Sequence, residues 1–284
     1  MCRGLGLDSL CSNEDARLTL HDPDVATMLS ARIAVILALV IGAPAWAGTS
    51  NEEHLRLQTR RGPIHLWTPQ DYDPSSAATI IYVHGYYVDV DTAWQRYRLR
   101  DQFRESGVNA LFIVCEAPRS ERDTIAWSSL GALLDAARTA TQPRGGRLIA
   151  IGHSGAHRTL SGWLGDAGLD TIVLIDAAYG ELAPYAAWLE ARPGRRLLDV
   201  GSITRAATDA FHRGLPDSLV IERLPDPRRG GLPDAALDAR VVYVRARASH
   251  MELVTDGIAI PMLLRTLAVP LVPGADRTAP LQSI

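Results

Sequence analysis

The chain has 284 residues, with 29 basic and 32 acidic side chains and a net charge of −3. This length is enough to bury a large core without disulfides or metal ions. The hydrophobic fraction of 47% and the charged fraction of 21% are typical of a globular protein. The near-neutral charge argues against a dedicated nucleic-acid binder, which would carry a clustered basic field. All 29 basic residues are Arg, so a P-loop lysine, a Schiff-base lysine and a Ser-Lys dyad are excluded.

Residues 1–47 are typical of a processing signal with an N-terminal extension. An apolar run extends from Ile33 to Ile41, with Arg32 before it and Ala45-Trp46-Ala47 after it. A positive residue, a short apolar stretch and a small-x-small site describe a secretory signal peptide. The run is shorter than the about 20 residues that span a membrane. We therefore expect an exported protein, periplasmic or secreted, with no stable membrane insertion after signal cleavage. The alternative is a chain anchored by an uncleaved N-terminal helix.

The start of translation is predicted at Met28. Residues 1–27 are acidic overall, whereas the first part of a signal peptide is positive. Cleavage is expected after Ala47, which leaves Cys115 as the one cysteine of the mature domain. An internal disulfide is then impossible, and Cys115, at the end of an apolar run, is interpreted as a small buried hydrophobe.

Strand-like and helix-like segments alternate after Ala47. Buried strands alternating with helices imply a mostly parallel sheet covered on both faces. Ligands then bind at the carboxyl ends of the strands. We expect one domain over 48–270 and an irregular tail over 271–284. The expected strands are 54–60, 63–67, 78–84, 109–115, 148–152, 171–176, 196–200 and 240–247; the expected helices are 91–106 with Asp91 as its cap, 127–141, 154–165, 182–191, 204–212 and 258–267; 216–239 is expected as loop.

The string Gly152-His153-Ser154-Gly155-Ala156 follows one of these apolar strands and opens a helix. A sharp strand-to-helix turn lifts a serine above the sheet and needs small flanking residues, because the backbone closes on itself. The start of the helix also directs backbone N–H groups at developing negative charge. The alternative is a serine that caps an ordinary helix.

This string resembles the Gly-x-Ser-x-Gly nucleophile elbow of the α/β-hydrolase family, with Ala156 replacing the last glycine. The resemblance extends from about Ala78 to His250. It implies a single-domain α/β-hydrolase with a mostly parallel central sheet flanked by helices on both faces. It also implies Ser154 as nucleophile and His250, after the last strand, as general base. Asp176 ends the strand after the elbow helix, so the order Ser, acid, His is kept.

The acid of this triad has alternatives. Many family members place it one strand later, where Asp199 lies inside the expected strand and Asp209 in the next helix. Asp176 is favoured because it lies at the carboxyl end of a strand, where catalytic groups gather. Its role would be to hold the histidine tautomer and to stabilise the imidazolium.

The resemblance places the oxyanion loop after the strand that ends at His84-Gly85. The backbone N–H groups of Tyr86 and Gly155 are the expected oxyanion donors. Aromatic residues near the strand ends are expected to line an acyl or leaving-group pocket, with core or rim positions as the alternative. The residues predicted to contribute to binding are His84, Gly85, Tyr87, Trp127 and His153.

No metal and no cofactor are expected. His153 and His157 have a spacing that can hold zinc on a helix, but no Glu lies between them as a metalloprotease needs. The sequence therefore predicts an exported serine hydrolase that cleaves an ester or amide of a small-molecule or peptide-like acyl substrate through an acyl-enzyme. The alternatives are a catalytically silent α/β-hydrolase-fold binding module and a metal-dependent hydrolase.

Overall fold

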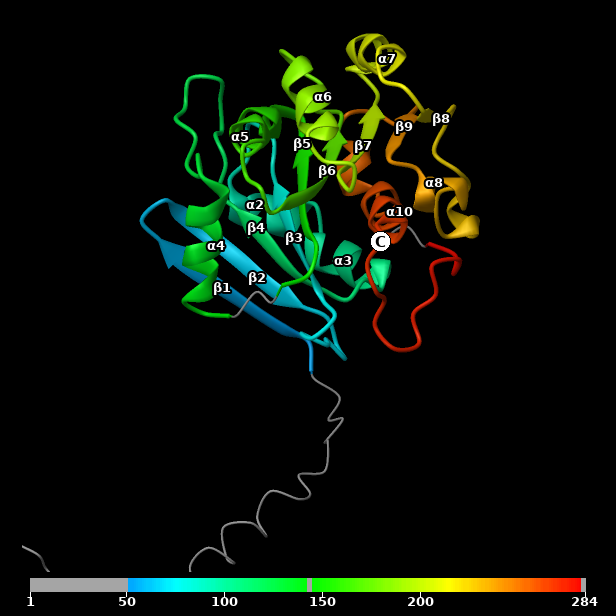
Figure 1. Cartoon of the computed structure of the whole chain (residues 1–284). Coiled ribbons are helices and arrows are strands. Elements are labelled where there is room, and N and C mark those ends of the chain that lie inside the picture. Colours follow the sequence, from blue (N-terminus) through cyan, green and yellow to red (C-terminus); the bar gives the residue numbers. More distant parts are fainter. Residues whose placement is uncertain (1–50, 142–144, 282–284) are drawn as a thin grey trace, which may run out of the picture. The chain divides into compact units, whose positions relative to one another are not determined.

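A nine-stranded mixed sheet forms the centre of the domain (Figure 1). The computed structural model describes residues 51–141 and 145–281, so the predicted signal peptide lies outside the described residues. The strand order is β1-β2-β4-β3-β5-β6-β7-β9-β8. The strands are β1 (Glu53–Thr59), β2 (Gly62–Thr68), β3 (Ala78–Val83), β4 (Ala110–Cys115), β5 (Leu148–His153), β6 (Leu169–Ile175), β7 (Arg196–Gly201), β8 (Ser218–Ile221) and β9 (Val241–Arg245).

The sheet is parallel except at one end. β2 runs antiparallel to both β1 and β4, which confirms the predicted opening hairpin. From β4 to β8 every pairing is parallel, so the carboxyl ends of these strands meet at one edge. The helical elements are α2 (Val90–Arg96), α3 (Leu99–Ser106), α4 (Leu130–Arg138), η1 (Ser154–Ala156), α5 (His157–Gly162), α6 (Ala183–Glu190), α7 (Arg205–Arg213), η2 (Pro227–Arg229), α8 (Ala235–Asp238), α9 (Glu252–Thr255) and α10 (Ala259–Thr266).

Helices cover both faces of the sheet, as predicted. Successive side chains of a strand point to opposite faces, and in β3 Ile80 belongs to one apolar core while Ile81 belongs to another. The first core includes residues of α2, α3 and α10; the second includes residues of α4, α5 and α6. Strands buried on both faces explain the continuous apolar runs in the sequence.

The helix expected over 91–106 is in fact two helices. The chain breaks between α2 and α3 at Arg98, whose backbone is left-handed with φ of 50°. The cap also lies two residues earlier than expected: Asp89, not Asp91, accepts a hydrogen bond from the Thr92 amide at 2.7 Å. Asp91 instead pairs with Arg56 of β1 at 2.7 Å.

Two other expectations need correction. The 216–239 segment, expected as loop, contains the edge strand β8, which pairs in parallel with β9. The helix expected from 127 begins only at Leu130, because Ser129 caps it by accepting from the Ala132 amide at 3.3 Å. After α10, residues 271–281 contain one isolated bridge, Val108 to Leu271, and no helix. Within the described part of the chain, none of the helices has the length and apolarity needed to cross a membrane.

Candidate active site

Ser154 lies on a sharp turn between β5 and the elbow helix. Its backbone is left-handed, with φ of 55°, a conformation that non-glycine residues adopt at functional strain. The neighbours have to be small. A Cβ on Gly155 would lie 2.5 Å from two ring carbons of Tyr86, and a Cβ on Gly152 would lie 3.0 Å from the Ala156 Cβ. Ala156 is fully buried, so a methyl group fits where the family motif has its last glycine.

Asp176 and His250 meet at the same edge of the sheet. Asp176 follows β6, His250 follows β9, and His250 Nδ1 lies 2.7 Å from Asp176 Oδ2. Asp176 is fully buried and accepts further hydrogen bonds from the loop after β7. These come from the amides of Ser202 at 2.9 Å, Ile203 at 3.2 Å and Thr204 at 2.9 Å, and from the Thr204 hydroxyl at 2.7 Å.

This set of donors keeps Asp176 ionised. Burial alone would raise the pKa of the carboxyl, but the hydrogen bonds from His250, Thr204 and Ser202 outweigh it and hold the pKa well below its ordinary value. A carboxylate can only accept, so the Nδ1 atom of His250 carries the proton. The Nε2 atom is then an acceptor, which is the tautomer that a general base needs.

The two alternative acids have partners elsewhere. Asp199 is buried in β7, where its Oδ2 lies 3.3 Å from Nε2 of His212 and burial raises its pKa. Asp209 accepts from Arg245 at 2.9 Å. Asp176 is therefore the member of the three predicted acids that the structure brings to His250.

His153 packs behind the catalytic candidates. Its ring lies 4.5 Å from that of His250, centroid to centroid, and its Nε2 donates to the His250 carbonyl oxygen at 3.2 Å. Burial lowers the pKa of His153 to about 3, so the ring is neutral at physiological pH. It supports the backbone of His250 and does not line the cavity beside Ser154.

The loop after β3 lies directly against the nucleophile. A Cβ on Gly85 would be 2.8 Å from the Ser154 Cβ. The buried His84 accepts from the Ala117 amide with Nε2 at 3.0 Å and donates with Nδ1 to the Gly85 oxygen at 2.7 Å. In a planar trans peptide the Tyr86 N–H points away from the Gly85 carbonyl oxygen. The Tyr86 amide thus points away from His84, and no hydrogen bond from it is seen among the described residues.

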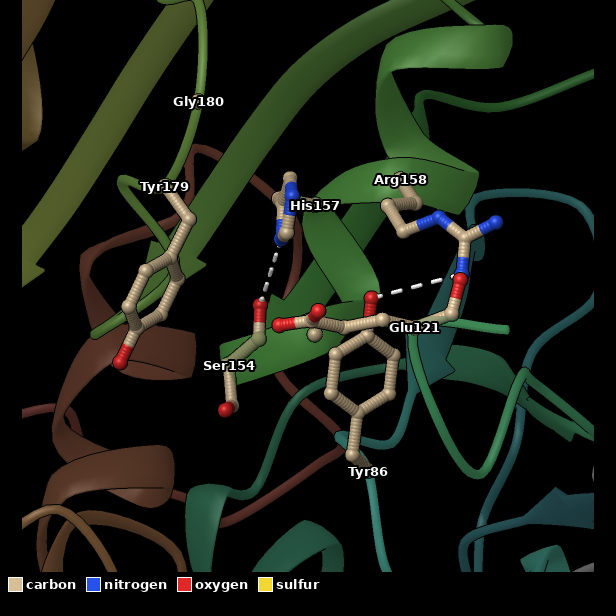
Figure 2. A pocket seen from close by; sticks show the side chains of 8 residues that line it. Tyr86, Glu121, Ser154, His157, Arg158, Tyr179 and Gly180 are labelled. Carbon is tan, nitrogen blue, oxygen red and sulfur yellow. Dashed lines mark hydrogen bonds between the residues drawn. The ribbon is translucent and has the colours of Figure 1, made fainter. Parts of the chain in front are cut away.

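A cavity of about 520 Å³ opens beside Ser154 (Figure 2). Arg158 donates to the carbonyl oxygens of Ser120 at 3.2 Å and Glu121 at 2.9 Å, and His157 Nδ1 donates to the Ser154 carbonyl oxygen at 3.3 Å. The cavity therefore combines aromatic walls with charged and polar groups. Its lining residues are Tyr86, Glu121, Ser154, Gly155, His157, Arg158, Tyr179 and Gly180.

Sequence reasoning missed several lining residues. The clearest is Tyr179, which lines the cavity beside Ser154; burial and the Asp176 charge raise the pKa of its hydroxyl. It lies three residues after Asp176, so the rule that functional residues follow parallel strands would have found it. His157, by contrast, carries no signal in the sequence that would separate it from an ordinary polar helix residue.

The structure corrects two predicted binding residues: His153, which packs behind His250, and Trp127. Trp127 is only 2% exposed, belongs to the apolar core and accepts from the Trp163 indole at 2.7 Å through its carbonyl. It does not line the cavity. Tyr87 lies at the rim with 90% of its surface exposed. Among the described residues, no group of three His, Cys, Asp or Glu side chains is arranged to hold a metal ion.

Comparison with known proteins defines the fold. No protein-family model and no curated protein sequence matches the chain. Among solved structures, it is similar to a feruloyl esterase module from Clostridium thermocellum complexed with sinapinate, with 10% identity, a TM-score of 0.50 and coverage of 77% of this chain and 89% of that one. S-formylglutathione hydrolase from Staphylococcus aureus has 13% identity, a TM-score of 0.49 and coverage of 76% and 96%. The chain has the α/β-hydrolase fold.

Proposed function

We propose that this protein is an exported serine hydrolase that cleaves an ester through an acyl-enzyme on Ser154. The observation that carries the proposal is the Asp176–His250 pair, 2.7 Å long, at the sheet edge where Ser154 occupies a left-handed turn. The similar fold of the feruloyl esterase module supports the choice of an ester as the substrate.

In the proposed reaction, His250 Nε2 takes the proton of Ser154 as Oγ attacks the ester carbonyl. Asp176 stabilises the resulting imidazolium through Nδ1–H. The amides of Tyr86 and Gly155 donate to the tetrahedral oxyanion, and each such donor is worth about 2.7–4 kcal/mol in other hydrolases. The intermediate collapses when His250 returns its proton to the departing alcohol. Water then attacks the acyl-enzyme by the same steps and releases the acid.

A fluorophosphonate probe tests the nucleophile. We expect the probe to label Ser154 covalently, and Ser154→Ala to abolish both labelling and ester turnover. The matched control is Ser161→Ala, because Ser161 lies in α5, the helix that follows the Ser154 turn, and its hydroxyl donates to the Arg158 carbonyl oxygen at 3.1 Å. Labelling that persists in Ser154→Ala would refute Ser154 as the nucleophile. A wild type that takes up no label would refute the proposal and favour a binding module.

Export is part of the proposal and rests on residues 1–47 alone. N-terminal sequencing of the mature protein is expected to begin at Gly48. A mature protein that begins at Met1 or Cys2 would refute both the signal peptide and the start at Met28.

A further inference from the structure

Exposed apolar side chains concentrate around the candidate active site. Single exposed hydrophobic residues are ordinary on a protein surface. Here, however, three of the five large ones in the described chain adjoin site residues. Tyr87 follows Tyr86, Met251 follows His250, and the Ile203 amide donates to Asp176. The five, with their exposed fractions, are Leu55 (45%), Tyr87 (90%), Ile203 (65%), Val220 (39%) and Met251 (43%).

These three residues, here called the apolar rim, do not line the cavity itself, but each is adjacent or hydrogen-bonded to a residue of the site. Ile203 and Met251 lie on the acid–base side, because Asp176 Oδ2 accepts from both the Ile203 amide at 3.2 Å and His250 Nδ1 at 2.7 Å. Tyr87 lies on the oxyanion side. Its ring meets the Tyr86 ring edge-on, with centroids 6.3 Å apart, and Tyr86 covers Gly155.

Tyr87 is held at the rim in a strained conformation. Its φ of 68° is left-handed, which bulky residues avoid. The Tyr87 amide donates to the Arg119 carbonyl oxygen at 2.9 Å and fixes this backbone. A ring that is 90% exposed gains little from packing within the protein. The exposed Tyr87 ring is therefore held in place and free to contact a ligand.

The cavity and the rim differ in chemistry. Figure 2 shows the Glu121, His157 and Arg158 side chains around the space beside Ser154. No carboxylate lies within ion-pair distance of Arg158 in the described chain, and its guanidinium donates to carbonyl and hydroxyl oxygens. An alkyl chain would desolvate these groups without satisfying them. The apolar part of a substrate is therefore better placed outside the cavity.

We propose that the apolar rim binds the alkyl chain of a medium-chain ester while the polar end of the substrate occupies the cavity. The inference rests on the proposed function and names its substrate class. Each methylene group that becomes fully buried raises the affinity about fourfold. A chain of about eight carbons that is partly covered by the rim should thus gain at least tenfold in kcat/KM over an acetyl group.

The test compares p-nitrophenyl acetate with p-nitrophenyl octanoate, the latter below its aggregation concentration. We expect wild type to prefer octanoate, and each of Tyr87→Ser, Ile203→Ser and Met251→Ser to lower the octanoate-to-acetate ratio of kcat/KM about fivefold. The matched controls are Leu55→Ser and Val220→Ser, because these residues are similarly exposed but lie on the edge strands β1 and β8. The controls should leave the ratio unchanged.

Several outcomes would overturn the rim proposal. A ratio unchanged in all three rim variants, with acetate still hydrolysed, would refute the rim alone. A ratio lowered equally by the control variants would do the same. Wild-type dimers that the rim variants dissociate in sedimentation would assign the rim to a second copy of the chain. A wild type that neither hydrolyses acetate nor takes up fluorophosphonate would instead refute the proposed function, and the rim proposal with it.

Discussion

Replacing Asp176 by Asn probes the geometry on which the proposed mechanism depends. The Oδ1 atom accepts from the Ser202 amide and from both the amide and hydroxyl of Thr204, whereas Oδ2 accepts from the Ile203 amide and His250. The single amide oxygen of Asn should occupy the position with more donors. Its NH₂ group then faces His250 Nδ1, which has to become an acceptor. The proton moves to Nε2, and the ring can no longer accept the proton of Ser154.

The expected loss of kcat is large, about 10⁴-fold, as in other hydrolases with this wrong tautomer. The stability cost should be smaller. The Ile203 amide loses its acceptor, and an unsatisfied donor costs about 1–3 kcal/mol when buried, so about 1–3 kcal/mol is the upper bound for this partly buried amide. We therefore expect Asp176→Asn to fold, with a free energy of unfolding in urea lowered by no more than that amount and p-nitrophenyl acetate turnover near background.

Asp199→Asn and Asp209→Asn are the controls for this prediction. Asp199 contacts His212 and Asp209 contacts Arg245, so neither change alters the partner of His250. Both variants should keep kcat within about threefold, since they leave the reacting groups in place. Near-normal activity in Asp176→Asn together with a collapse in either control would show that the acid has been assigned wrongly.

Three further changes test other parts of the site. Gly155→Ala should lower kcat about 10²-fold in steady-state kinetics, because its Cβ would lie 2.5 Å from the Tyr86 ring and displace an oxyanion donor. Gly165→Ala, which has open space around its Cβ, should leave kcat unchanged in the same assay. Tyr179→Phe should lower kcat about tenfold with little change in KM if its hydroxyl assists at Ser154, and an unchanged kcat would contradict that role. His153→Gln tests acid stability. Burial lowers the pKa of His153 to about 3 in the folded state, whereas an unfolded histidine takes up its proton near pH 6.5. The unfolded state therefore binds more protons in this window, and the free energy of unfolding falls by up to about 1.4 kcal/mol per pH unit as pH drops from about 6.5 to about 3. Urea unfolding should show a shallower fall in the variant, and an unchanged slope would refute this source of acid sensitivity.

The sequence alone determined the layered architecture and the position of the elbow. Apolar runs such as those of β3 and β5 are continuous because both faces of a parallel sheet are covered, and this is a local pattern. The turn at Ser154 is partly local, because a Cβ on Gly152 would meet Ala156 and Leu160 of the helix that follows, whereas Gly155 has to be small because the distant Tyr86 ring covers it. His250 could be predicted from the sequence as well, because it lies just beyond the last strand.

Only the tertiary structure showed which acid meets His250. The sequence favoured Asp176 for its place at the end of a strand, but Asp199 in the neighbouring strand stayed an alternative because no local pattern gives its distance to His250. The difference comes from residues 202–204, which lie beyond β7 and supply the amides and hydroxyl that keep Asp176 ionised. Packing likewise decided the position of Trp127, which lies in the core. From sequence alone, an aromatic residue near a strand end is equally compatible with a core position and a pocket position. A role that depends on hydrogen bonds or packing between residues far apart in sequence has no local signature. Such roles can be assigned only from the folded structure.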